Sequence, residues 1–336
     1  MKKNRKLKFW LLGIAAFLIA AVFCLWPTQY YIEAPGEAFQ ISKYVKSTRK
    51  ANPNFYLVTV SERPEVMIDY LTSFLRPADS RYSKDELMGT STSAEYNQMQ
   101  RYYMETSQNN AIYYAAKKAN VPHRQEFLGV YVMEIMSNSN FKNKLKVGDV
   151  LVSVNGKKFN SSQELIKYVS SLKKSKVRIE VIRGKKHLTF SGETVKLSGT
   201  NRYGIGIQLV DHTRVVTKPA VKIDAEDIGG PSAGLMFTLE CYQLFTGKNL
   251  SSKKIAGTGT IDDQGKVGMI GGVDKKVIAA SRQGMKVFFA PTDQPSGVKK
   301  SETNYAEAVK TAKKIHTKMK IVPVARFEDA LNYLEK

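Results

Sequence analysis

From about residue 201 to its end the chain alternates apolar strands with helices, and this alternation constrains the fold more than any other feature. Strands are expected at 221–223, 253–257, 286–290 and 321–324, and helices at 232–245, 273–283, 305–315 and the C-terminus. Elements in such an order bury their apolar faces when helices cover a sheet. We therefore expect an α+β fold in which residues 199–336 form a mixed sheet covered by helices.

One turn in this region has the composition of an oxyanion-binding site. Residues 229–234 read Gly-Gly-Pro-Ser-Ala-Gly and place Ser232 where a strand gives way to a helix. Glycines allow close approach of a substrate, proline suits a first helical turn, and unpaired N–H groups with the helix dipole favour negative charge. An oxyanion hole needs such donors. The same turn also fits a simple helix cap in which Ser232 bonds its own first turn, so this motif alone leaves both interpretations open.

A second motif lies at residues 271–276, which read Gly-Gly-Val-Asp-Lys-Lys at the start of an expected helix. In this order the two segments resemble the peptidase domain of Lon-type proteases, which pairs Gly-Pro-Ser-Ala-Gly with Gly-Gly-x-x-x-Lys. The resemblance implies that Ser232 and Lys276 form a catalytic pair. Adjacent helical residues point about 100° apart, so only one lysine faces the serine, and the spacing selects Lys276. Lys275 is expected to be a solvated or substrate-side charge.

The same resemblance implies supporting roles for three other residues. Thr258, within Ala-Gly-Thr-Gly, would hydrogen-bond the amine of Lys276 and orient it. An ordinary strand threonine is the alternative for this position. Backbone groups around Gly230 and Pro231, together with Ser232, would hold the oxyanion.

The chemistry sets a requirement on the pKa of Lys276. An exposed lysine has a pKa of about 10.4, which must fall to about 7 to 8 before the amine acts as a general base. Neutral Lys276 would take the proton of the Ser232 hydroxyl and return it to the leaving amine, and water would release the acyl-enzyme. Many Lon-type sites have an aspartate where this chain has Gly229, although Asp224 and Asp227 are close in the sequence.

Upstream, residues 127–184 resemble a PDZ domain of the bacterial protease-associated kind, with Phe-Leu-Gly-Val at 127–130 and Gly-Asp-Val-Leu-Val-Ser-Val-Asn-Gly at 148–156. Such domains present backbone N–H groups of a glycine-containing loop to a peptide carboxylate and pair a strand with the peptide. The resemblance places this loop and the strand start at Leu128, Gly129 and Val130, with the helix at 162–172 as one wall of the groove. A small β-rich domain that only packs is the alternative.

The N-terminus indicates a membrane anchor. Basic residues dominate positions 1–8, and residues 9–26 form an uncharged apolar run long enough to cross the hydrocarbon core of a bilayer. The excess of basic residues before this run predicts a single-pass protein with a cytoplasmic N-terminus, lipid contact through this helix and a catalytic domain outside the cell. A cleaved signal peptide is the alternative, but the run lacks a small-x-small cleavage site.

Several other chemistries find no support in the sequence. The net charge of +22 would usually indicate nucleic acid, but the expected topology leaves anionic lipid, wall polymers or acidic peptides as partners. The four histidines have no metal-ligand spacing, and nothing matches a Walker A or dinucleotide-binding motif. Cys241 is expected to be a small buried hydrophobe, unpaired with Cys24. No metal, cofactor or nucleic acid is expected.

The expected organisation has five parts. These are a basic tail (1–8), an apolar anchor (9–26), N-terminal strands with a helical segment that packs with the peptidase domain (27–120), a PDZ domain (121–198) and a Lon-type Ser/Lys peptidase domain (199–336). The helical pattern is expected over residues 65–120, with Met67, Tyr70, Leu71 and Phe74 at three- and four-residue spacing, and its Met and Tyr side chains are expected to be core.

Together these features predict an ATP-independent serine endopeptidase at the outer face of the cell membrane. Its expected partners are exported peptides, secreted signalling peptides among them, or flexible and unfolded protein segments. The sequence sets no oligomeric state. A non-catalytic membrane-anchored PDZ scaffold and a peptide sensor are the alternatives, and both predict an isolated C-terminal domain without activity.

Overall fold

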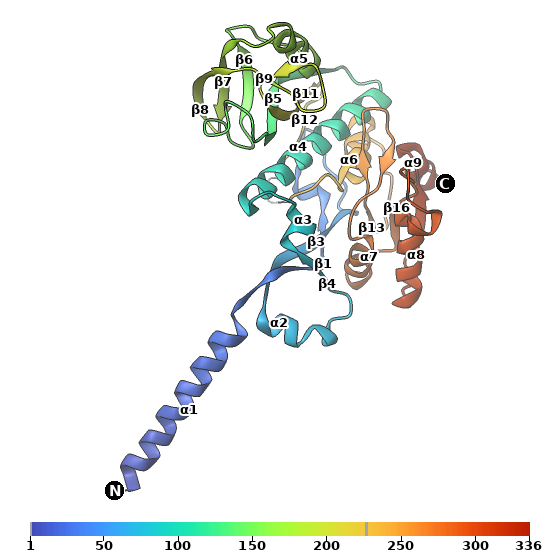
Figure 1. Cartoon of the computed structure of the whole chain (residues 1–336). Helices are drawn as coiled ribbons and strands as arrows, with labels where there is room; N and C mark the ends of the chain where they lie inside the picture. The colour runs from blue at the N-terminus through green and yellow to red at the C-terminus, as the bar shows by residue number, and fades with distance from the viewer. Residues whose placement is uncertain (1, 226–227) are drawn as a thin grey trace.

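The computed structural model describes residues 2–225 and 228–336. Its α-helices are α1 (Lys2–Cys24), α2 (Met67–Leu71), α3 (Lys84–Met88), α4 (Ser93–Lys118), α5 (Ser162–Ser171), α6 (Gly234–Thr246), α7 (Val273–Arg282), α8 (Asn304–Lys314) and α9 (Phe327–Leu334) (Figure 1). Short 3-10 helices are η1 (Ile41–Lys43), η2 (Ser73–Leu75) and η3 (Lys300–Glu302).

The strands fall into two larger sheets and several short pairs. They are β1 (Pro27–Gln40), β2 (Val45–Ser47), β3 (Phe55–Val66), β4 (Ser80–Ser83), β5 (His123–Ile135), β6 (Val150–Val154), β7 (Lys176–Arg183), β8 (Lys186–Glu193), β9 (Val195–Lys196), β10 (Tyr203–Gly204), β11 (Ile207–Thr217), β12 (Val221–Ile223), β13 (Ile255–Gly257), β14 (Thr260–Ile261), β15 (Val267–Gly268), β16 (Val287–Pro291) and β17 (Lys320–Val324).

A six-stranded mixed sheet with the order β17-β16-β13-β3-β1-β4 is the centre of the larger part of the molecule. β13 runs parallel to β3 and β16, and β16 runs parallel to β17. β1 is antiparallel to both β3 and β4. Three strands from the N-terminal quarter of the chain therefore complete a sheet whose other strands come from its C-terminal third.

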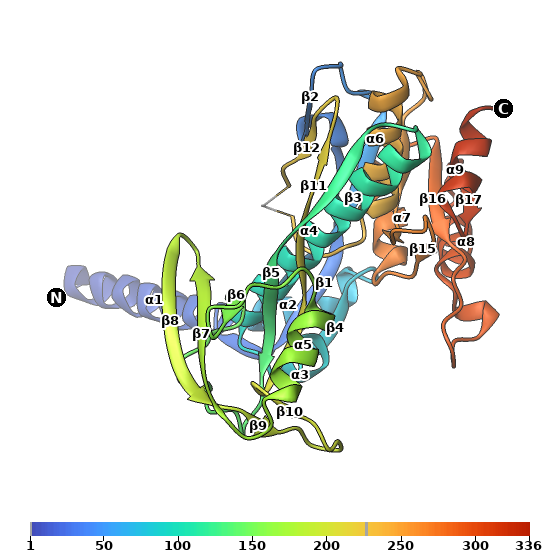
Figure 2. The same cartoon turned by 90° about the horizontal axis from the view of Figure 1, so that it is seen from above.

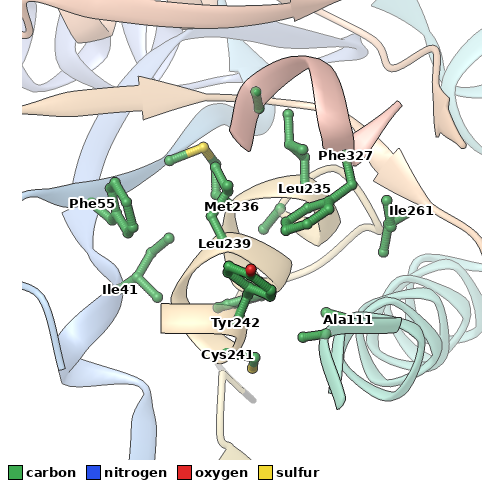
Figure 3. Packing of buried hydrophobic residues seen from close by; sticks show 14 of the residues in the cluster. Ile41, Phe55, Ala111, Leu235, Met236, Leu239, Cys241, Tyr242, Ile261 and Phe327 are labelled. Atoms are coloured by element: carbon green, nitrogen blue, oxygen red, sulfur yellow. The ribbon is translucent and has the colours of Figure 1, made fainter. Parts of the chain in front are cut away.

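Helices cover both faces of this sheet, because successive residues of a strand point to opposite sides. Phe55 and Leu57 of β3 pack toward α4, α6 and α9, while Tyr56 and Val58 pack toward α7 and α8. Figure 3 shows the first of these two cores, where Phe327 of α9 lies against side chains of α6. The α+β class and the helix-covered mixed sheet agree with the expectation from sequence.

The second large sheet is antiparallel and has the order β11-β5-β6-β7-β8. α5 covers it, and Leu165 and Val169 of this helix are buried in a core with Val132, Leu151 and Ile179 of the strands. These two helix residues fill the interior of the region expected to be a PDZ domain.

The helix α4 lies between the two sheets in both views (Figures 1 and 2). It packs on α6 from one side and on β5 and β11 from the other. Tyr102 and Met104 are buried, but Tyr103 is 40% exposed, so only part of the Met and Tyr side chains of this helix is core.

The segment before α4 differs from the expected continuous helical pattern. β4 lies within this segment and pairs with β1. The short helices α2 and η2 come before β4 in the chain. Leu71 and Phe74 are 49% and 77% exposed, although their spacing predicts a buried stripe. The reason is that pairing with β1 takes the chain back to the sheet edge and leaves α2 and η2 as a connection on the surface.

The expected membrane anchor is wrong. α1 ends at Cys24, so the uncharged apolar part of the helix covers residues 9–24. At about 1.5 Å per residue this part is about 24 Å long, which is less than the roughly 30 Å of a bilayer's hydrocarbon core. Within residues 2–225 and 228–336, no helix combines the length and the apolar character that a membrane crossing needs. The predicted single-pass topology, its external catalytic domain and the lipid partner depended on that crossing and lose their support.

The carboxylate of Glu240 in α6 is buried beside the apolar core. It is 0% exposed, and one oxygen accepts a hydrogen bond of 2.9 Å from the backbone N–H of Asn52. The other oxygen has no hydrogen-bond partner among the described residues. Burial raises the pKa of Glu240 to about 7. Because the folded pKa exceeds the unfolded value of about 4.3, this group favours folding at low pH, and the contribution is lost as the pH rises through 7.

Glu240→Gln should therefore raise the free energy of unfolding at pH 8 by up to about 3 kcal/mol, since the glutamine keeps an acceptor for Asn52 and removes the buried charge. The gain should shrink toward pH 5. Urea denaturation at pH 5 and pH 8 measures both values, with the exposed Glu134→Gln as the matched control. An equal gain at the two pH values would contradict the argument.

Candidate active site

Three segments that are distant in the sequence meet at the carboxyl end of β13. Thr258 follows β13 directly, Ser232 lies two residues before α6, and Lys276 lies in the first turn of α7. The helices α6 and α7 pack on opposite faces of the sheet, so their N-terminal ends approach each other at this strand end. Ligand sites in sheets with parallel strands commonly lie at this end. The expected helix start at Ser232 is two residues too early.

Hydrogen bonds link these three residues. The Nζ atom of Lys276 lies 2.7 Å from Oγ of Ser232 and 3.4 Å from Oγ1 of Thr258. The Thr258 hydroxyl donates to the backbone carbonyl of Ser232 at 3.1 Å, and the N–H of Gly259 donates to the same carbonyl at 2.8 Å. The residues after β13 thus hold the backbone of Ser232 while its hydroxyl contacts Lys276.

Lys276 is 4% exposed, and its burial has an electrostatic consequence. Burial disfavours the ammonium and lowers the pKa of Lys276 to about 8, while the carboxylates of Glu33 and Glu62 oppose this shift. A lysine in this state has a substantial neutral fraction near pH 8, unlike an exposed lysine with a pKa of about 10.4. The contact with Ser232 is therefore one between a hydroxyl and an amine that is available as a proton acceptor.

Lys275 is not the solvated or substrate-side charge that the sequence predicts. It is 3% exposed, and its Nζ atom lies 3.3 Å from Oε1 of Glu33 and 3.2 Å from Oδ2 of Asp274. The reason is the packing of α7 against β1, which buries the side of the helix that carries Lys275.

A cavity of about 700 Å³ opens beside Ser232 and Lys276. Much of its wall comes from β1, β3 and α4, where the sequence indicated no chemistry, and includes Glu62 and Tyr96. The Tyr96 hydroxyl donates to Glu62 at 3.2 Å. One sequence signal for this wall is the Pro-Gly pair at 35–36 within a strand, because such residues mark bulges. The pairing of β1 with β3 is irregular at this place.

The turn before Ser232 is held by α4. The N–H of Gly230 donates to the backbone carbonyl of Gln100 at 3.0 Å, and the Ser107 hydroxyl donates to the carbonyl of Pro231 at 2.8 Å. Gly230 has a φ of +84°, which favours glycine. Its N–H is therefore engaged in this structure and is not free for the oxyanion role expected of it. Sequence reasoning missed Gln100 and Ser107, which lie in a helix without a recognisable motif.

The other titratable residues considered from the sequence lie elsewhere or outside the described part. Asp227 is outside the described residues, and Asp224 forms an ion pair of 3.3 Å with Lys46. Nε2 of His212 lies 3.0 Å from Oε1 of Glu105 on α4. Among residues 2–225 and 228–336, no group of three or more His, Cys, Asp or Glu side chains could hold a metal ion.

The expected peptide-binding loop at residues 128–130 is not a loop. Leu128, Gly129 and Val130 lie inside β5. Gly129 and Val130 pair with β11, and Val130 also pairs with β6 on the opposite edge. A peptide that adds a strand needs a free edge, and both edges are occupied at Val130.

An edge without a neighbouring strand lies on β11, beside α5. The N–H of Ser162, at the start of α5, donates to Oδ1 of Asp211 at 3.0 Å, and the Ser170 hydroxyl near its end donates to the carbonyl of Tyr203 at 3.2 Å. α5 therefore runs beside residues 203–211. A strand edge beside a helix is the arrangement with which PDZ domains hold extended peptides. The missed sequence signal is Tyr-Gly-Ile-Gly-Ile at 203–207.

The helix α4 covers the rest of this edge. The Tyr102 hydroxyl donates to the carbonyl of Asp211 at 2.9 Å, and the side-chain amide of Asn109 bonds the carbonyl of Thr213 and the N–H of Val215. The part of the edge that faces α5 and remains uncovered by α4 is therefore short and centres on residues 207–209.

Comparison with protein families gives two matches. Residues 88–194 match the PDZ domain family, and residues 169–334 match the C-terminal proteolytic domain of Lon protease. The chain is thus a PDZ-containing, Lon-like protein, and its C-terminal region is a serine peptidase domain of the Lon type.

Curated relatives agree with this class. The Lon protease of Campylobacter jejuni is 28% identical over 236 residues, which cover 64% of this chain and 26% of that protein. The Lon protease of Desulfosudis oleivorans is 40% identical over 103 residues, which cover 31% of this chain and 12% of that protein. The chain spans between 11% and 36% of the length of such relatives.

Among solved structures, the PDZ domain of the SdrC-like protein from Listeria monocytogenes is 34% identical. The likeness covers 25% of this chain and 90% of that one, with a TM-score of 0.24.

The arrangement of β11 predicts where a peptide pairs with the PDZ domain. A short peptide with a free C-terminus should slow amide hydrogen exchange at residues 204–209 and leave residues 128–130 unchanged, because the latter are already paired. Exchange measured by mass spectrometry on the Ser232→Ala protein avoids cleavage of the peptide. New protection at 128–130 with none at 204–209 would show that the groove lies elsewhere.

Proposed function

We propose that the chain is an ATP-independent endopeptidase that uses Ser232 as nucleophile and Lys276 as general base to cleave peptides or flexible protein segments. The observation that carries this proposal is the 2.7 Å contact between Oγ of Ser232 and the buried amine of Lys276. A hydroxyl is a weak nucleophile by itself, and an adjacent base of lowered pKa activates it.

In the proposed reaction, neutral Lys276 takes the hydroxyl proton as Oγ of Ser232 attacks the scissile carbonyl. The ammonium of Lys276 then gives the proton to the leaving amine, and an acyl-enzyme remains on Ser232. Water, deprotonated by the same amine, attacks the acyl carbonyl and restores the serine. Thr258 positions both partners, because its hydroxyl lies within 3.4 Å of Nζ and donates to the carbonyl of Ser232.

The proposed substrates follow from what the chain carries. No Walker A pattern is present in the sequence, so cleavage is proposed to need no nucleotide. Without nucleotide-driven unfolding, the cavity of about 700 Å³ takes extended chain that is already flexible. The PDZ domain is proposed to capture such substrates, since an extended peptide can pair with the short uncovered edge of β11.

Ser232→Ala and Lys276→Ala should each lower kcat/KM for an unstructured peptide by about 1,000-fold or more, because nucleophile and base act as a unit. The assay contains no nucleotide and is repeated with ATP. Ser198→Ala and Lys318→Ala, which change the same residue types at exposed positions, should retain wild-type rates. Full activity in either folded site variant would rule out the proposed Ser232–Lys276 pair, whereas a folded wild-type protein without activity would favour the non-catalytic scaffold.

The pKa of Lys276 predicts the pH dependence. Only the neutral amine accepts a proton, so kcat/KM should rise with pH and reach half of its maximum near pH 8. Below that pH each unit should cost about tenfold in rate. A small amide substrate without ionisable groups measures this profile between pH 6 and pH 10. A profile that falls with pH, or that is flat over this range, would contradict the role of Lys276.

A further inference from the structure

Lys275 and Lys276 of α7 lie near the same carboxylates, but their amines contact different partners. The amine of Lys276 contacts Ser232 at 2.7 Å, whereas the amine of Lys275 contacts Glu33 at 3.3 Å and Asp274 at 3.2 Å. The side chain of Lys275 is 3% exposed and that of Glu33 is 12% exposed. This ion pair is therefore a buried one, directly beside the proposed catalytic base.

Glu33 is held against the start of α7. A Cβ atom added to Gly272, which precedes α7, would lie 3.1 Å from Oε1 of Glu33. This oxygen is buried and has no hydrogen-bond partner of standard geometry within the described residues. Its ion pair with Lys275 is thus the polar contact that compensates for its burial.

The polar and charged groups around Lys275 and Lys276 come from five elements. Glu33 of β1 lies directly opposite Glu62 of β3 in the sheet, so both side chains point to the same face. α7 itself adds Lys275 and Asp274, α8 adds Glu307, and α4 adds the Tyr96 hydroxyl bonded to Glu62. Glu33 and Glu62 are the two carboxylates that act on Lys276. Of these two carboxylates, Glu33 also forms an ion pair with Lys275.

We propose that Lys275 is a positioning residue of the peptidase site, which keeps the Glu33 carboxylate engaged so that it does not become the counterion of Lys276. Without Lys275, the buried carboxylate of Glu33 would still act on the amine of Lys276, whose charged form it already favours. An ion pair there would fix Lys276 in its ammonium form and withdraw it from Ser232. This inference rests on the proposed function, because it assigns Lys275 a role in keeping Lys276 available as a base.

A purely structural role for this ion pair makes a different prediction. Buried ion pairs are weak evidence for stability, and breaking one changes the free energy of unfolding without a defined effect on a neighbouring titration. The pH profile of kcat/KM separates the two roles, because only the proposed one moves its midpoint.

The first variant is Lys275→Met, which keeps the length of the side chain and removes its charge. The midpoint of kcat/KM should move to higher pH by about 1 unit, the size expected for one nearby carboxylate. At a pH below both midpoints the rate should fall about tenfold, while the plateau at high pH should remain close to that of the wild type. Lys275→Arg retains the positive charge and should restore a midpoint near that of the wild type.

The second variant is Glu33→Gln, which removes the carboxylate and should move the midpoint to lower pH. In the double variant Glu33→Gln with Lys275→Met, the upward shift should disappear, since no carboxylate is left to pair with Lys276. Lys266→Met is the matched control for the change in net charge, because Lys266 pairs with Asp293 and is 55% exposed. Its midpoint should remain that of the wild type.

The proposal is wrong if Lys275→Met and Glu33→Gln leave the midpoint unchanged, or if Lys275→Met shifts it equally in the Glu33→Gln background. If Lys275→Met does not fold, Lys275→Gln replaces it in the single and double variants, with the same expected midpoints. The proposed function fails separately, through full activity of Ser232→Ala or Lys276→Ala. If Lys276→Ala is inactive but the midpoint of the pH profile of kcat/KM is unchanged in the Lys275 and Glu33 variants, the proposed function stands and the proposed role of Lys275 is wrong.

Discussion

The contact between the buried amine of Lys276 and the hydroxyl of Ser232 is the interaction on which the rest of the site depends. An amine removed from water is tolerated only when polar atoms replace its hydration, and here Ser232 and Thr258 supply them at 2.7 Å and 3.4 Å. The same burial lowers the pKa of Lys276 to about 8. The packing that buries Lys276 is therefore also what lowers its pKa, because contact with water would favour the ammonium form and raise the pKa again.

The sheet explains how this contact forms between residues so distant in the sequence. Phe55 and Leu57 of β3 anchor one helix layer, and Tyr56 and Val58 anchor the other. α6 and α7 are thereby fixed on opposite faces, and the carboxyl end of β13 lies near both of their starts. Thr258 follows that strand end, which lets one side chain contact both partners. The geometry of the site is thus set by the two apolar cores rather than by the polar contacts themselves.

The helix α4 connects this site with the PDZ sheet. Ser107 bonds the carbonyl of Pro231 in the turn before the serine, and Asn109, two residues further on, bonds the outer edge of β11. Glu105 accepts hydrogen bonds from Tyr131 of β5 and His212 of β11. One helix therefore contacts both the proposed catalytic turn and the strand beside which a peptide is proposed to bind. A displacement of β11 would therefore act on the turn before Ser232 through the contacts of α4.

The sequence by itself determined the elements with strong local signals: the order of strands and helices in the C-terminal region, the turn before α6, and the burial of Cys241. These follow from periodicity and glycine placement, which act over a few residues, whereas the proposed pairing of Ser232 with Lys276 came from the resemblance to Lon-type peptidases. Only the tertiary structure decided that β1 and β3 complete the sheet, that Lys275 is buried against Glu33, and that the N–H of Gly230 is already bonded to Gln100. It also showed that an unpaired strand edge lies on β11, that Val130 is paired on both sides, and that α1 ends at Cys24. The physical reason is that strand pairing, charge pairing and helix ends depend on partners far away in the chain, which no local pattern specifies.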